Sequence, residues 1–105
     1  MLSSQDALDL LRRCLERGRI IPGRHFREEL ANEGLELVDA WHVMRRTGVI
    51  FDAPEWNITT GEWKYKIEGY APDGEWLVIV FCFKELDKTF LITAWAVEGR
   101  RKKEP

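Results

Sequence analysis

The residue best suited to proton transfer in this sequence is His25, because histidine is the side chain that changes charge near neutral pH. It lies just inside a predicted helix, one turn before Glu29. A carboxylate at position i+4 can hold an imidazole ring in one orientation, so this spacing indicates a general acid–base pair. The same position also suits a histidine that caps or packs the start of a helix and takes no part in catalysis.

Two lysines, Lys64 and Lys66, form a second set of residues that could do chemistry. They alternate with apolar residues in the segment 63–68, and a period of two predicts a strand with one apolar and one charged face. Their amines would then project from the same side of the sheet, opposite Tyr65. Two neighbouring cations can neutralise a phosphate, although an ordinary solvated strand face would have the same pattern.

Arginines are concentrated in the first quarter of the chain. Residues 12–27 contain six arginines and a single acid, Glu16, whereas the whole chain has a formal net charge of -2. A block of this kind is compatible with contacts to nucleic-acid phosphates, and it is also typical of a solvated helix face with ordinary ion pairs. Because the chain as a whole is not basic, any site for a polyanion must be local.

An α+β domain must position these residues, since helical periodicity fills the first half of the chain and strand alternation the second. The first helix is predicted to end at Gly18. Two further helices are predicted over residues 24–32 and 37–47. The strands are predicted over residues 63–68, 76–83 and 89–97, with residues 49–51 as a short fourth strand. We therefore expect two to three N-terminal helices on one face of a three- to four-stranded antiparallel sheet.

A tight turn at residues 71–74, with the sequence Ala-Pro-Asp-Gly, predicts a hairpin and its register. Residues 67, 65 and 63 would face residues 79, 81 and 83. The apolar face of this hairpin would meet the helices and bury Trp63, Tyr65, Phe81 and Phe83. Lys64 and Lys66 would stay accessible on the opposite face. The run 76–83 is apolar on both faces, which predicts a central strand.

Composition excludes several classes of protein. A chain of 105 residues, 45% of them hydrophobic, predicts a single folded domain. Cys14 and Cys82 lack metal-ligand spacing, and no nucleophile elbow or glycine-rich phosphate loop is present, so neither a metal nor another cofactor is expected. No apolar run reaches the roughly 18 residues of a membrane span, which predicts a cytoplasmic protein. Residues 99–105 form a basic tail that is predicted to be mobile.

Several short motifs occur in an order that resembles a known family. They are RHFREEL at residues 24–30, KYKIEG at residues 64–69 and the ITAW strand at residues 92–95. This series resembles domain-of-unknown-function family 4258, and the resemblance covers about residues 19–98. The family is a relative of the RelE/ParE toxin superfamily, whose members are helix-capped antiparallel sheets. Members are often encoded beside MqsA-type zinc-ribbon antitoxins.

The resemblance implies a toxin-like component of a type II toxin–antitoxin pair. Its activity would be metal-independent cleavage of mRNA, on the ribosome or free of it, and its partner would be a separate antitoxin chain. The implied catalytic residues are His25, Glu29, Lys64 and Lys66. The implied RNA-binding residues are Arg24, Arg27, Arg45 and Arg46.

Two other readings of the sequence remain open. The chain could be a non-catalytic module that uses the same sheet to hold a protein partner, a reading favoured by Trp56 in a predicted loop, since tryptophan is enriched at interface hot spots. It could also be a degenerate relative with a structural role only.

Overall fold

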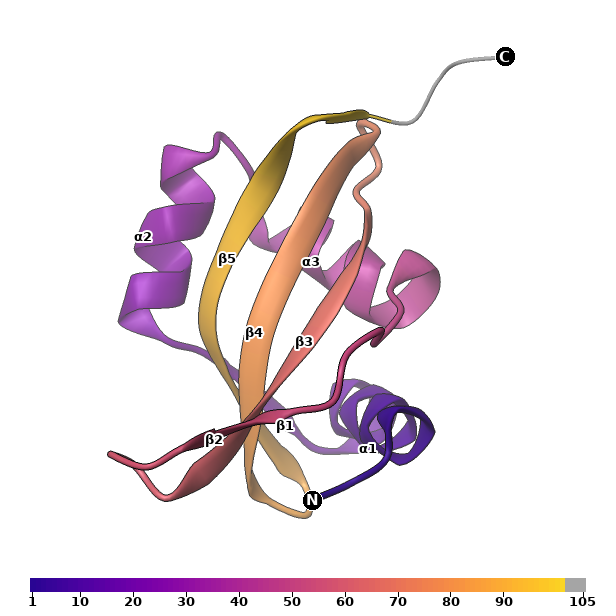
Figure 1. The fold of residues 1–105 in the computed structure, drawn as a ribbon. Coiled ribbons are helices and arrows are strands. Elements are labelled where there is room, and N and C mark those ends of the chain that lie inside the picture. Colours follow the sequence, from indigo (N-terminus) through magenta and orange to yellow (C-terminus); the bar gives the residue numbers. More distant parts are fainter. Residues whose placement is uncertain (102–105) are drawn as a thin grey trace.

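The computed structural model describes residues 1–101 and contains helices and one mixed sheet (Figure 1). The helical elements are α1 (Ser4–Arg17), α2 (Arg24–Asn32), α3 (Leu37–His42) and the π-helical turn η1 (Val43–Thr47). The strands are β1 (Arg19–Pro22), β2 (Glu55–Asn57), β3 (Glu62–Tyr70), β4 (Glu75–Glu85) and β5 (Lys88–Arg101). The predicted α+β class is confirmed.

The sheet has five strands in the order β1-β5-β4-β3-β2, and β1 runs parallel to β5. The prediction of three to four strands, all antiparallel, is therefore wrong. Strand β1 has only four residues, which are too few to show a strand alternation in the sequence. Its conformation depends on pairing with β5, about 70 residues further along the chain, in which Ile20 is the partner of Thr89. The segment predicted as a fourth strand contributes only a single bridge, Val49 to Glu68.

The central hairpin follows the predicted register. Tyr65 pairs with Phe81 and Ile67 with Ile79, and Gly74 adopts a φ of 91° in the turn, a conformation that glycine accepts without strain. The β3–β4 ladder begins at Tyr65, so the predicted pairing of residues 63 and 83 is not part of it. Trp63 pairs instead with Trp56 of β2.

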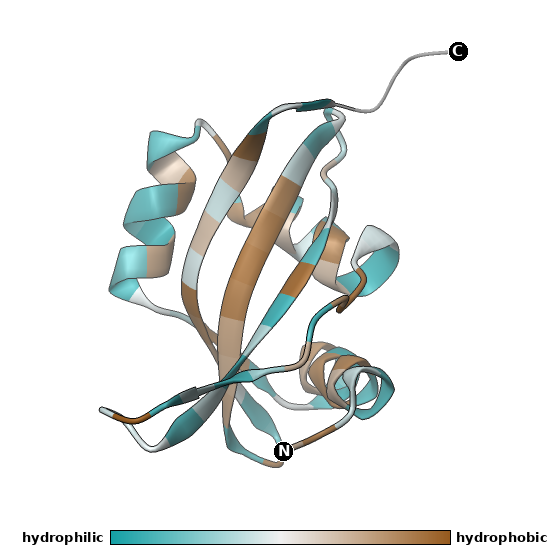
Figure 2. Cartoon of the chain, viewed as in Figure 1, coloured by the Kyte–Doolittle hydropathy of each residue, from teal (hydrophilic) through white to brown (hydrophobic). Residues whose placement is uncertain are grey.

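The core lies between the helices and one face of the sheet. It joins α1, α2 and η1 to β3, β4 and β5 through one cluster of buried apolar side chains, which includes Leu11, Phe26, Met44, Ile67 and Phe81. Tyr65 and Phe81 are buried as predicted, whereas Trp63 and Phe83 are only partly buried. Strand β4 is apolar along most of its length and is central, as expected (Figure 2).

Strand β5 extends further than the sequence pattern indicates. The tail predicted to be mobile begins at Gly99, but β5 continues through this residue, and the guanidinium of Arg100 lies 3.5 Å from the ring centroid of Trp76. A cation–π contact of this kind holds the strand end against the sheet and cannot be seen from tail composition. The rest of the predicted tail, residues 102–105, lies outside the described residues. No helix in residues 1–101 is long and apolar enough to cross a membrane.

Candidate functional site

The face of the sheet that carries no helices is hollowed by two adjoining cavities. The larger, of about 400 Å³, is lined by Lys64 and Lys66 of β3, by Val80 of β4 and by Trp95 of β5, with the segment after η1 along its rim. The smaller, of about 200 Å³, shares Lys64 with it and continues toward Cys82 and Lys84. We call the two cavities together the sheet groove.

The electrostatics of the sheet groove leave one amine available for a ligand. Lys66 forms a 3.4 Å ion pair with Asp52, and Lys84 lies 2.8 Å from both carboxylate oxygens of Glu62. Lys64 forms no hydrogen bond or ion pair with any residue of the described part, 1–101. The unpaired, half-buried amine of Lys64 is suited to binding one anionic group, in a cavity that the Glu55 carboxylate, opposite Lys64 in the β2–β3 ladder, also lines.

Two other titratable groups of the sheet groove, the Cys82 thiol and the Lys84 amine, stay protonated at neutral pH. Burial, with a smaller contribution from the Glu62 carboxylate, raises the pKa of the Cys82 thiol to about 11. The thiol is therefore protonated at neutral pH and is a poor nucleophile. The hydrogen bond to Glu62 raises the pKa of Lys84, so this amine stays charged.

The structure does not bring the predicted acid–base pair to the lysines. Helix α2 buries Phe26 and Leu30 in the core on the helix-bearing side, and this orientation leaves His25 exposed. Neither His25 nor Glu29 lines the cavities that contain Lys64 and Lys66. Among the described residues no hydrogen bond joins the His25 ring to Glu29, so the i+4 spacing alone does not orient the ring.

The four predicted RNA-binding arginines also separate into two places. Arg24 and Arg27 are exposed on α2, where Arg24 forms a 2.9 Å ion pair with Glu28. Arg45 and Arg46 are on η1 and line a different cavity.

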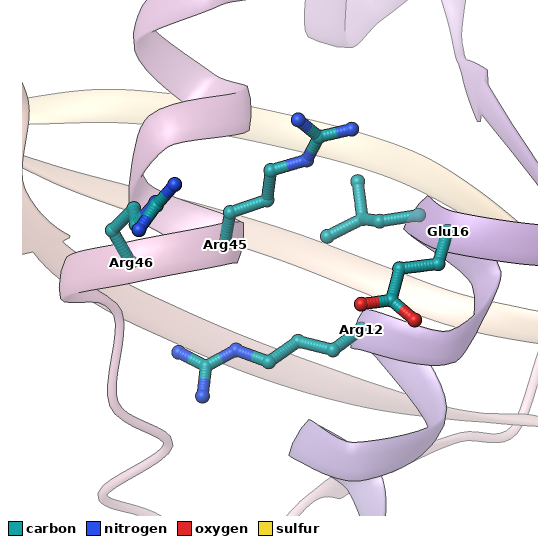
Figure 3. Close-up of a pocket in the computed structure, with 5 residues that line it drawn as sticks. Arg12, Glu16, Arg45 and Arg46 are labelled. Atoms are coloured by element: carbon teal, nitrogen blue, oxygen red, sulfur yellow. The ribbon is translucent and has the colours of Figure 1, made fainter.

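The cavity lined by Arg45 and Arg46, of about 600 Å³, lies between α1 and η1, and its other lining residues are Arg12, Leu15 and Glu16 (Figure 3). We call it the arginine pocket. In the sequence Arg12 belongs to a basic block, and nothing in that pattern connects it with Arg45, which is more than 30 residues away. The excess of arginine in residues 12–27 was the sequence signal for Arg12, while the resemblance implied Arg45 and Arg46 as RNA-binding residues.

Metal binding and similarity to known proteins add no further residues to these sites. No group of three or more His, Cys, Asp or Glu side chains in residues 1–101 is placed to hold a metal ion.

The resemblance to family 4258 stays a prediction that rests on the short sequence motifs. No protein-family model matches the chain, and neither a curated protein nor a solved structure is significantly similar to it.

Proposed function

We propose that this chain is a toxin-like, RNA-directed protein that binds single-stranded RNA in the sheet groove. The observation that carries the proposal is the position of Lys64 and Lys66 on one half-buried face, where Lys64 has no partner within residues 1–101. Bound RNA would be cleaved without a metal, and a separate antitoxin chain would control the activity, as the sequence resemblance implies.

The side chains of the sheet groove suit single-stranded RNA better than a double-stranded nucleic acid. Single-stranded RNA is recognised by cations that neutralise its phosphates and by aromatic faces on which its unstacked bases lie. The sheet groove offers amines on β3 and, across the sheet, the rings of Phe90 and Trp95 on β5. Because Asp52 is two-thirds exposed, its ion pair with Lys66 is weak, and a phosphate can replace the carboxylate.

Loss of both lysines should weaken RNA binding. For the double variant Lys64→Ala/Lys66→Ala we expect an affinity for a fluorescein-labelled oligouridine about tenfold to a hundredfold lower than that of the wild type. Each lost phosphate contact also reduces the salt slope of a single strand by about 0.7, so the slope should fall by about 1.4. Fluorescence anisotropy over a range of salt concentrations measures both quantities.

The matched control is Arg13→Ala/Arg17→Ala, which removes two positive charges from exposed positions of α1. It should leave affinity within about twofold of the wild type, because long-range charge effects are screened. Equal losses in the two double variants would show that binding follows net charge, and the sheet groove would no longer be the RNA site.

A second candidate function, a protein-binding module, is favoured by an exposed apolar corner at strand β2. This strand forms the edge of the sheet, Trp56 is 52% exposed and Ile58, in the following turn, is 87% exposed. Exposed apolar side chains beside an unpaired strand edge suit an added strand or a covering chain. A cognate antitoxin, of the zinc-ribbon type that the resemblance implies, is the expected partner.

Co-expression with the product of the neighbouring gene tests this second function. We expect a complex that survives size-exclusion chromatography and buries at least about 1,000 Å². Trp56→Ala/Ile58→Ser should weaken the complex about 30-fold or more, as expected for loss of an interface hot spot. Val38→Ser, at an exposed apolar position of α3, is the matched control. A complex that is unaffected by the first variant would exclude the β2 corner as the interface.

A further inference from the structure

The arginine pocket brings three cations together from two separate elements. Arg12 comes from α1, while Arg45 and Arg46 are consecutive residues of η1, and Figure 3 shows the two pairs of labelled residues on opposite sides of the cavity. The only acid that lines the pocket is Glu16. Three guanidinium groups against one carboxylate give this cavity an excess of positive charge, whereas the three lysines that line the sheet groove are matched by the carboxylates of Asp52, Glu55 and Glu62.

One of these arginines is already fixed in position. Arg12 donates from Nε to the carbonyl of Met44, at 3.2 Å, and from a terminal nitrogen to the carbonyl of Gly48, at 3.5 Å. A guanidinium group has five N–H donors, so three remain after these two hydrogen bonds. Because the side chain is held before any ligand arrives, little rotamer entropy is lost on binding.

The other two arginines are free to bind. Arg45 and Arg46 are exposed, and within residues 1–101 neither forms an ion pair. Their backbone is held by tight packing of the π-helical turn on β3, since a Cβ atom at Gly48 would lie only 2.5 Å from both the Val43 carbonyl oxygen and Ile67. The two side chains are therefore unpaired and extend from a turn that is closely packed on the sheet.

We propose that the arginine pocket binds a phosphate monoester, such as the 5′-phosphate of a nucleotide. Guanidinium forks match the oxygens of a phosphate, and a dianion balances the net excess of two positive charges in the lining. The volume of about 600 Å³ lies within the range of small-ligand pockets, roughly 300–1,000 Å³. Leu15 is the only apolar side chain in the lining, so recognition depends on the phosphate and not on the base.

This site is separate from the sheet groove and from the proposed RNA function. Leu11 of α1 and Met44 of η1 both belong to the core on the helix-bearing side, whereas Lys64 and Lys66 line the opposite face. A ligand in the arginine pocket therefore does not touch the lysines. Lys64→Ala/Lys66→Ala should bind the phosphate monoester as the wild type does, and this variant distinguishes failure of one proposal from failure of the other.

Isothermal titration calorimetry with adenosine 5′-monophosphate tests the proposal, with adenosine as the ligand that lacks the phosphate. We expect the monophosphate to bind and adenosine not to bind. Arg45→Ala/Arg46→Ala should weaken binding about tenfold or more, because two charge-assisted hydrogen-bond donors are lost. Glu16→Gln should strengthen it about threefold, because a nearby carboxylate no longer repels the ligand.

The matched control is again Arg13→Ala/Arg17→Ala, which leaves the arginine pocket intact and should retain the wild-type affinity. Thermal melting checks that every variant folds. Comparison of 5′-phosphorylated with 5′-hydroxyl oligouridine, made in the Lys64→Ala/Lys66→Ala variant so that the sheet groove does not contribute, distinguishes the source of the phosphate, since recognition of an RNA terminus would make the 5′-phosphorylated strand bind more tightly than the 5′-hydroxyl strand. Equal binding of adenosine and its monophosphate, no binding of either, or equal losses in the two double-arginine variants would overturn the proposal.

Discussion

Replacement of Phe81 with alanine is expected to lower the free energy of unfolding by about 3–5 kcal/mol. Phe81 is fully buried in the central strand β4. The centroid of its ring lies 5.7 Å from the ring centroid of Tyr65 and 5.5 Å from that of Phe83. Truncation removes both aromatic contacts and leaves a cavity that the surrounding strands fill only in part. A domain of this size is stable by only about 5–15 kcal/mol, so the loss is a large fraction of the total.

Urea denaturation followed by tryptophan fluorescence measures this effect as a shift of the midpoint at constant slope. Phe51→Ala is the matched control, because Phe51 is 58% exposed and makes only a 6.3 Å ring contact with Trp76. We expect this control to change stability by about 0.5 kcal/mol or less. Similar losses in the two variants would mean that the β3–β4 face is not the centre of the core.

The second large effect concerns RNA cleavage. If His25 is the proton-transfer group of the proposed nuclease, His25→Ala should lower the cleavage rate about 10²–10⁴-fold and relieve growth arrest on expression, with no change in RNA affinity. His25 lies far from the two lysines, because α2 packs along β5, two strands away from Lys64 and Lys66 on β3. His25 would therefore act on a phosphate other than the one held by the lysines.

His42→Ala provides a histidine control, since His42 is half-buried at the end of α3 and lines neither cavity of the sheet groove. Rates measured with purified RNA, with and without ribosomes, separate cleavage from indirect effects of expression. Cleavage by His25→Ala at the wild-type rate would remove His25 from the mechanism and leave RNA binding by the lysines unaffected. Absence of cleavage by the wild type would favour the protein-binding function.

Features that depend on neighbouring residues were predictable from the amino-acid pattern. Alternation at residues 63–68 and the turn at residues 71–74 specified the β3–β4 hairpin, including the pairing of Tyr65 with Phe81. The apolar run of β4 likewise indicated a central strand. Such features are readable because side-chain period and turn chemistry are local properties, and a one-residue change of register would expose an apolar face.

The distant residues that share a site are brought together by long-range packing of helices and strands. The short strand β1 exists because it pairs with β5, and the arginine pocket exists because α1 packs beside η1 and places Arg12 next to Arg45. The separation of His25 from Lys64 was decided in the same way, because burial of Phe26 orients α2 on the other side of the sheet. Several arrangements of the helices and strands are equally compatible with local periodicity, and long-range packing selects one of them. Residue spacing therefore cannot predict which of these distant residues lie close together.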